Sequence, residues 1–155
     1  MAVANEQEHI HLIWSATDHR VIIEDQYRQR FLAVVQEAIE SCKVHRRADR
    51  AAFRKQFKAL LDFLGQWAFE RKEKLARIFL TVGQERLLFL VVTKARNYDN
   101  DLESELTQLD VEVAHNQDFS RICLSVQALP CCGKNGYGSF CNPRATLEYA
   151  WLNVE

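Results

Sequence analysis

The segment 130–143 concentrates the reactive side chains of this sequence. It reads PCCGKNGYGSFCNP and contains three of the five cysteines and five of the seven glycines and prolines of the chain. Glycine lets the backbone turn sharply. A cation such as Lys134 lowers the pKa of a neighbouring thiol and so favours the nucleophilic thiolate. The candidate thiol site therefore consists of Cys131, Cys132, Cys141 and Lys134.

Zinc binding at this Cys/Gly segment would need four ligands, two of its cysteines together with Cys123 or His115. Adjacent cysteines such as Cys131 and Cys132 rarely both reach one ion, and the sequence has no Cys-x-x-Cys pair. The spacing therefore disfavours zinc, and we expect no metal and no cofactor.

Two other chemistries compete with a structural role for the same segment. A disulfide between Cys141 and Cys131 or Cys132 would make a redox switch. The hypothesis of a phosphate-binding loop has less support, because no Gly-x-x-x-x-Gly-Lys-Ser/Thr spacing surrounds Gly133 and Lys134. The interpretation that we favour is a mobile surface loop whose cysteines are small apolar fillers.

A second candidate site is a basic surface on the helix expected over residues 48–74. Residues 42–77 carry eleven lysines and arginines against four acidic residues, whereas residues 97–118 carry seven acidic residues and no lysine or arginine. Steps of three and four residues place four cations on one helical face: Arg47, Arg50, Arg54 and Lys58. Such a face binds phosphates, an acidic partner or the acidic segment of a second copy, but an ordinary solvated face is the more common outcome.

Two histidines, His9 and His11, lie on one face of an expected strand. They could share a metal there, although half-buried strand histidines are more common. Neither His19 nor His45 has a carboxylate or thiol partner that the sequence makes evident. Cys42 falls on the inward stripe of an expected helix and should therefore be inert.

Composition places the chain among globular domains. Its 155 residues are 48% hydrophobic and 26% charged, and the net charge of −1 argues against a general nucleic-acid coat protein or a polybasic membrane binder. The sequence shows no signal-peptide pattern, no apolar run near the ~20 residues of a membrane helix, and none of the common nucleotide-binding, hydrolase or zinc-protease motifs. With no export signal and an odd number of cysteines, we expect the reducing cytoplasm.

The N-terminal elements have two interpretations. Alternation over 9–14 predicts a strand. A helix from Asp18 to about Cys42 should follow, because Asp18 is a good N-cap and the apolar residues recur at helical spacing. A hairpin through Ala16–His19 is the alternative, because the residues after it are β-branched.

The middle of the chain is more regular. A helix is expected over 48–74, where Gly65 indicates close approach of another element. Two strands are expected over 75–82 and 86–94, joined by a tight loop in which Gly83 takes positive φ. The second strand is apolar on both faces, so it should be central in its sheet.

A helix over 101–116 and a strand over 121–129 complete a parallel crossover. The last stretch, 145–155, is expected to form a short helix or an extended tail. The order β-α-α-β-β-α-β predicts a single α/β domain, 1–155, with a mixed sheet of about four strands.

The best interpretation of function is a cytoplasmic, non-enzymatic protein-interaction or regulatory domain, with a protein partner or self-association as a homodimer. A thiol- or metal-dependent activity at residues 130–143 is the alternative from a different class. Nucleic-acid binding through the basic surface is the second alternative.

We predict that the basic surface does not make this a specific DNA-binding protein, because the net charge is near zero and no helix-turn-helix spacing is present. A salt-titrated assay with mixed duplexes should show only weak association. Sub-micromolar binding near physiological salt, lost in Arg50→Glu and Arg54→Glu variants, would contradict this prediction.

Overall fold

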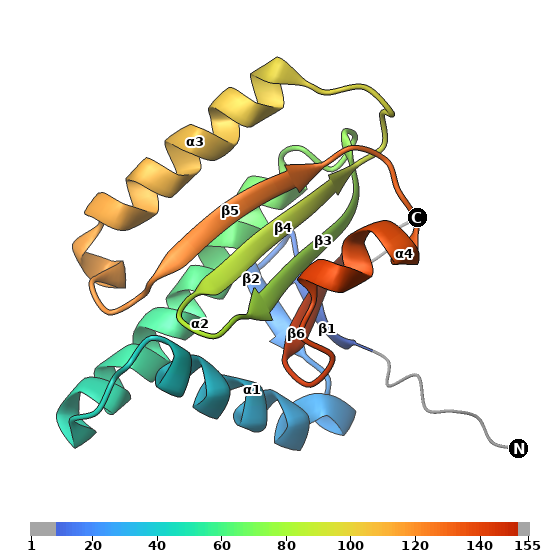
Figure 1. Ribbon diagram of the computed structural model, residues 1–155. Helices are drawn as coiled ribbons and strands as arrows, with labels where there is room; N and C mark the ends of the chain where they lie inside the picture. Colours follow the sequence, from blue (N-terminus) through green and yellow to red (C-terminus); the bar gives the residue numbers. More distant parts are fainter. Residues whose placement is uncertain (1–8, 152–155) are drawn as a thin grey trace, which may run out of the picture.

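The computed structural model describes residues 9–151, which form one mixed sheet of six strands and four α-helices (Figure 1). The strands are β1 (Ile10–Ser15), β2 (Arg20–Ile23), β3 (Leu75–Val82), β4 (Leu87–Thr93), β5 (Leu124–Leu129) and β6 (Thr146–Trp151). The helices are α1 (Arg28–Ser41), α2 (Arg47–Phe69), α3 (Asn100–His115) and α4 (Lys134–Tyr137), with 3-10 turns η1 (Asp25–Tyr27), η2 (Gln117–Phe119) and η3 (Gly138–Phe140). Within residues 9–151 no helix combines the length and the apolar character needed to span a bilayer.

The strands lie in the spatial order β2-β1-β6-β3-β4-β5. β1 runs parallel to β6, β4 runs parallel to β5, and the other neighbours are antiparallel. The mixed α/β class and the parallel crossover from β4 through α3 to β5 are confirmed. The expectation of about four strands in the order β-α-α-β-β-α-β is wrong, because it omits β2 and β6.

The chain turns back after β1 instead of entering a helix. His19 adopts a positive φ of 54°, and its N–H donates to the carbonyl oxygen of Ser15 at 2.8 Å, which closes the turn. The β-branched residues that follow pair with β1. The hairpin through Ala16–His19 is therefore confirmed, and the helix expected from Asp18 begins only at Arg28.

Within the stretch 145–155, expected as a short helix or extended tail, residues Thr146–Trp151 form β6 in the middle of the sheet, and residues 152–155 lie outside the described residues. This strand pairs with β1 on one side and with β3 on the other. Leu147 and Tyr149 lie in the main hydrophobic core, whereas Glu148 between them points to the opposite face. β6 pairs with β1 through Leu147–Trp151 and with β3 through Thr146, Leu147 and Glu148.

The sheet has two unequal faces. Helices α1, α2 and α3 pack against one face and enclose the main hydrophobic core, which includes Phe57 and Trp67 of α2 as expected (Figure 1). The Trp67 ring meets Phe89 of β4 edge-on at 5.8 Å. On the other face, Phe79 and Tyr137 belong to a smaller apolar cluster. Strand β4 is apolar on both faces, as expected: Phe89 and Val91 lie in the main core, whereas Leu90, Val92 and the partly exposed Leu88 belong to the smaller cluster.

Gly65 allows α2 to approach the sheet closely. A Cβ atom at this position would lie 2.6 Å from the indole of Trp14, so the expected close approach is confirmed. At Gly83 the expectation is wrong, because no glycine within residues 9–151 has positive φ. A hydrogen bond from the Gly83 N–H to the carbonyl oxygen of Arg86, 2.8 Å long, closes that turn.

We predict that Phe89→Ala destabilises the protein by about 3–5 kcal/mol, because Phe89 is fully buried between α2 and the sheet. Cys131→Ser should change the free energy of unfolding by less than about 0.5 kcal/mol, because Cys131 is exposed. Denaturant melts of the two variants provide the comparison. Equal losses would show that Cys131 is bonded or buried in solution.

Candidate functional site

The Cys/Gly segment lies at the surface, with most of its residues exposed, and contains two short helical turns. It forms α4 and η3 and lies across the sheet face opposite the three long helices (Figure 1). Tyr137 is buried there, and Cys132 and Cys141 pack partly buried against its cluster. Cys131 is exposed, and its N–H donates to the carbonyl oxygen of Ala95 at 2.8 Å. The role of apolar filler therefore suits Cys132 and Cys141.

A charged anchor on the sheet holds α4 in place. The Arg77 guanidinium donates to both carboxylate oxygens of Glu148, at 2.8 and 2.9 Å, and to the Tyr137 hydroxyl at 2.6 Å. The ring of His9 approaches Glu148 at 3.5 Å and meets Phe79 edge-on. Arg77 belongs to β3, Glu148 to β6, and His9 directly precedes β1. Because Tyr137 of α4 bonds to Arg77, this group of residues ties the Cys/Gly segment to the sheet.

The thiol of Cys141 is not activated by its surroundings. Burial raises its pKa to about 11, and the negative charge of Glu148 adds to the effect while Arg77 opposes it. Lys134 is not among the groups that shift the pKa of Cys141. A thiol that stays protonated is a poor nucleophile.

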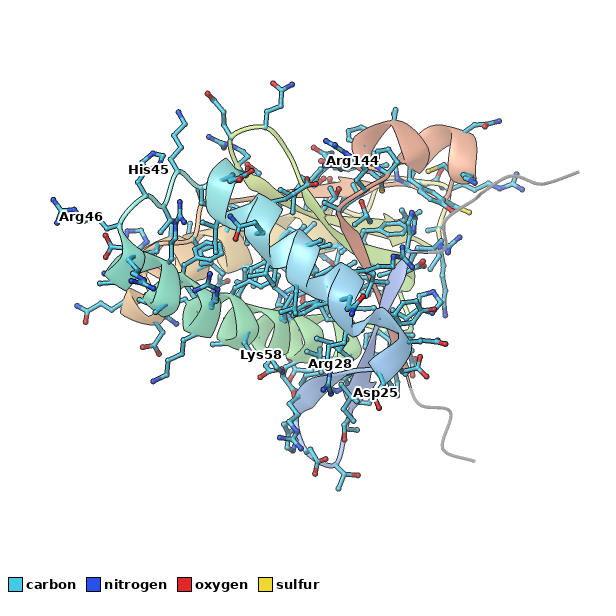
Figure 2. All side chains as sticks on the ribbon, turned by 90° about the horizontal axis from the view of Figure 1, so that it is seen from below. Asp25, Arg28, His45, Arg46, Lys58 and Arg144 are labelled. Atoms are coloured by element: carbon cyan, nitrogen blue, oxygen red, sulfur yellow. The ribbon has the colours of Figure 1, made fainter. Side chains whose placement is uncertain are left out.

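The four cations of the expected basic surface are not equally free. Arg47 and Arg54 are exposed, whereas Arg50 donates to the Val44 carbonyl oxygen and Lys58 pairs with Asp62 of its own helix at 3.2 Å. Figure 2 shows Lys58 well along α2 from Arg46, which precedes the helix. The four cations are thus spread along α2, and two of them, Arg50 and Lys58, already bond to other groups of the chain.

His9, which directly precedes β1, and His11, which lies in β1, do not form a metal site. His9 faces Glu148, and the ring of His11 lies 5.9 Å from that of Tyr27. Across residues 9–151, no cluster of three or more His, Cys, Asp or Glu side chains has the arrangement needed to hold a metal ion. Zinc ligation by Cys123 or His115 together with the Cys/Gly segment is therefore not supported.

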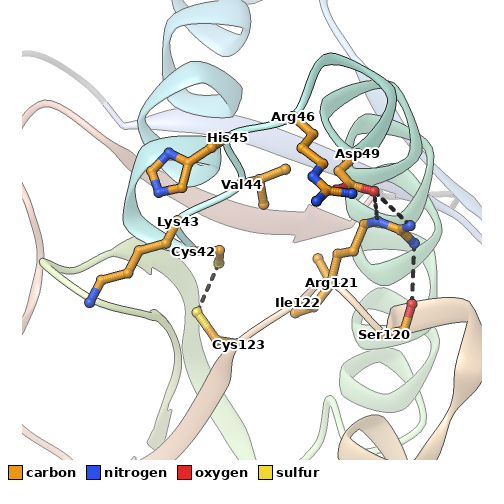
Figure 3. Close-up of a pocket in the computed structure, with 10 residues that line it drawn as sticks. All are labelled: Cys42, Lys43, Val44, His45, Arg46, Asp49, Ser120, Arg121, Ile122 and Cys123. Carbon is orange, nitrogen blue, oxygen red and sulfur yellow. Dashed lines mark hydrogen bonds and ion pairs between the residues drawn. The ribbon is translucent and has the colours of Figure 1, made fainter.

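The structure instead brings two other cysteines together. Cys42 caps the end of α1, Cys123 directly precedes β5, and their sulfur atoms lie 2.9 Å apart (Figure 3). The residues are 81 positions apart in the chain. The Cys123 carbonyl oxygen accepts from the Leu87 N–H at 2.8 Å, which fixes this backbone against β4. We expected Cys42 to be inert, and periodicity gives no signal for this pairing.

The surroundings of Cys42 disfavour its thiolate. Burial, together with the side-chain hydrogen bond with Cys123, raises the pKa of Cys42 to about 12. Cys42 is therefore protonated at neutral pH. The sulfur of Cys123 also lies 3.3 Å from the carbonyl oxygen of Glu85.

The thiol pair lines a cavity of about 690 Å³ between the α1–α2 connection and the residues that lead into β5 (Figure 3). Four basic side chains and one acidic side chain line the same cavity: Lys43, His45, Arg46, Arg121 and Asp49. Arg121 forms an ion pair with Asp49 at 2.9 Å, and its backbone N–H donates to Gln56, so the wall formed by Ser120 and Arg121 is fixed to α2. The arrangement is a positively charged cavity with a protonated thiol and its partner in the wall.

Comparison with models of protein families, with curated proteins and with solved structures finds no match to this chain. The functional argument therefore rests on the geometry of this site.

We predict that Glu148→Gln lowers the free energy of unfolding at neutral pH by about 2 kcal/mol. The variant should also lose less stability than the wild type when the pH is lowered. Burial raises the pKa of Glu148, but hydrogen bonds from His9 and Arg77 outweigh burial and leave the pKa below its ordinary value of 4.5. A lowered pKa in the folded state stabilises the protein above pH 4.5, and this contribution disappears as the pH falls through the folded-state pKa.

Thermal melts between about pH 2.5 and 7 measure this effect. Asp25→Asn is the matched control, because Asp25 pairs with Arg28 at the surface and is 92% exposed. An acid transition in Glu148→Gln as steep as in the wild type would rule out this role for Glu148.

Proposed function

We propose that this chain is a non-enzymatic regulatory domain whose switch is a reversible disulfide between Cys42 and Cys123. The separation of 2.9 Å between the two sulfur atoms carries the proposal. A disulfide bond holds its sulfur atoms ~2.05 Å apart, so small side-chain rotations suffice to close the gap. The two cysteines thus need no backbone rearrangement to react with each other.

The bond would join elements that are otherwise held by non-covalent contacts. It links the end of α1 to the start of β5 and closes a loop of 81 residues. In the chain-entropy description, a loop of this length stabilises the folded state by about 4.5 kcal/mol. Oxidation would therefore fix both walls of the cavity, and reduction would release the α1–α2 connection.

The Cys/Gly segment is a weaker candidate for the same role. Cys132 and Cys141 pack against the apolar cluster, and burial raises the pKa of Cys141. The regulated property, as the sequence interpretation expects, is binding to a protein partner or to a second copy of the chain. No substrate-processing step is needed for this function.

Treatment of the reduced protein with diamide should convert two of its five thiols to an intramolecular disulfide. Peptide mapping should assign this bond to Cys42 and Cys123. The melting temperature should rise by roughly 10 °C, given the loop length. Hydrogen exchange in residues 42–48 should slow in the oxidised form.

Cys42→Ser and Cys123→Ser should each abolish the bond and the rise in melting temperature, whereas Cys131→Ser and Cys141→Ser should retain both. Addition of dithiothreitol should restore the reduced melting temperature. The proposal is wrong if the bond maps to residues 131–141, or if Cys42 and Cys123 both stay reduced in excess diamide.

A further inference from the structure

We infer that the cavity beside Cys42 and Cys123 binds a small disulfide carrying carboxylates, of the glutathione disulfide class, and that Cys123 exchanges with it. The inference rests on the proposed switch and names its oxidant. The cavity volume of about 690 Å³ lies within the ~300–1,000 Å³ that is usual for small-molecule sites.

The charges of the cavity select an anion. Lys43, Arg46 and Arg121 contribute three positive charges and Asp49 one negative charge, so the lining carries a formal charge of +2 with His45 neutral. Asp49 is already engaged by Arg121. The uncompensated charge therefore belongs to the other two cations.

Both of these cations are available to a ligand. Among residues 9–151 the Arg46 guanidinium forms no hydrogen bond or ion pair, and Figure 3 shows it at the cavity. Lys43 meets Glu85 at 3.5 Å, but both side chains are about two-thirds exposed or more, and such surface pairs contribute little. Carboxylates of a bound disulfide would thus find two cations within the cavity that contains the thiols.

The burial of the two thiols sets the order of attack. Cys42 packs partly buried against the main hydrophobic core, and this burial disfavours its thiolate. We therefore assign the attack on the bound disulfide to Cys123. The Cys123 thiol gives its proton to water, its sulfur forms a bond to one sulfur of the ligand, the sulfur–sulfur bond of the ligand breaks, and one half leaves as a thiolate. The other half remains on Cys123 as a mixed disulfide.

Cys42 completes the exchange. Its proton passes to the departed thiolate, and its sulfur attacks Cys123. The mixed disulfide breaks, the second half of the ligand leaves as a thiolate, and this thiolate takes a proton from water. One small disulfide is reduced to two thiols, and two protein thiols are oxidised to one disulfide. Because the two sulfur atoms lie 2.9 Å apart, this second step is intramolecular.

The test compares oxidants of different charge on the reduced full chain. Glutathione disulfide is anionic, hydroxyethyl disulfide is neutral, and cystamine is cationic. At low salt the rate of Cys42–Cys123 bond formation should decrease in that order after correction for the rates with a free small thiol. The rates should converge at high salt, because screening removes the steering.

Charge-reversal variants distinguish the effect of a cation in the cavity from the effect of a cation elsewhere on the protein. Arg46→Glu should slow oxidation by glutathione disulfide by about tenfold or more and leave the rate with hydroxyethyl disulfide within about twofold. Arg54→Glu is the matched control, because Arg54 is an exposed cation of α2 outside the cavity, and it should leave both rates unchanged. In Cys42→Ser the glutathione adduct should accumulate on Cys123.

The outcomes separate the two proposals. Equal, salt-independent rates with anionic and neutral disulfides, or an adduct on Cys131 instead of Cys123, would overturn the anionic ligand while leaving the switch intact. Failure of every disulfide and of diamide to join Cys42 to Cys123 would overturn the switch itself.

Discussion

The sheet depends on one strand, because β6 alone connects its two parts. The hairpin of β1 and β2 touches the rest of the sheet through β6, and β3, β4 and β5 reach the hairpin through the same strand. β6 pairs with β1 on one side and, through its first three residues, with β3 on the other, and its side chains alternate between the two faces of the sheet. On the helix side, the buried Tyr149 hydroxyl donates to the Leu61 carbonyl oxygen of α2 at 2.7 Å. On the other side, Glu148 anchors Arg77 and thereby α4. One strand therefore fixes both layers of the molecule.

Sequence periodicity predicts the parts of this fold whose signal is local. Helices α2 and α3 and strands β3 and β4 lie close to their expected ranges, because each has a long run of one hydrophobic period. The prediction is wrong where the pattern is short. The apolar residues after Asp18 fit both the helical spacing and the alternation of a strand. A turn at His19 decides in favour of the hairpin. In β6 the four-residue spacing of Leu147 and Trp151 imitates a helix, although the polar residues alternate as in a strand.

The candidate site was less predictable, because its chemistry depends on contacts between distant parts of the chain. The Cys/Gly segment 130–143 has the conspicuous composition, yet its partly buried thiols pack against the smaller apolar cluster. Cys42 has an unremarkable position at the end of a helix, and Cys123 stands alone before a strand. Only the pairing of β4 with β5, together with the packing of α1 at the end of the sheet, places their sulfur atoms side by side. Composition identifies where reactive residues are frequent, whereas topology identifies which of them meet.

The position of β6 has a consequence for the order in which the molecule assembles during translation. Ile10 is paired with Leu147, so β1 acquires its parallel neighbour only after the other described strands of the sheet have been made. Until then the hairpin of β1 and β2 has an open edge, as does β3, and both edges are rich in β-branched and aliphatic residues. Contacts of such long sequence separation slow folding and prolong exposure of these edges. In the nascent chain both edges therefore stay unpaired until residues 146–151 arrive.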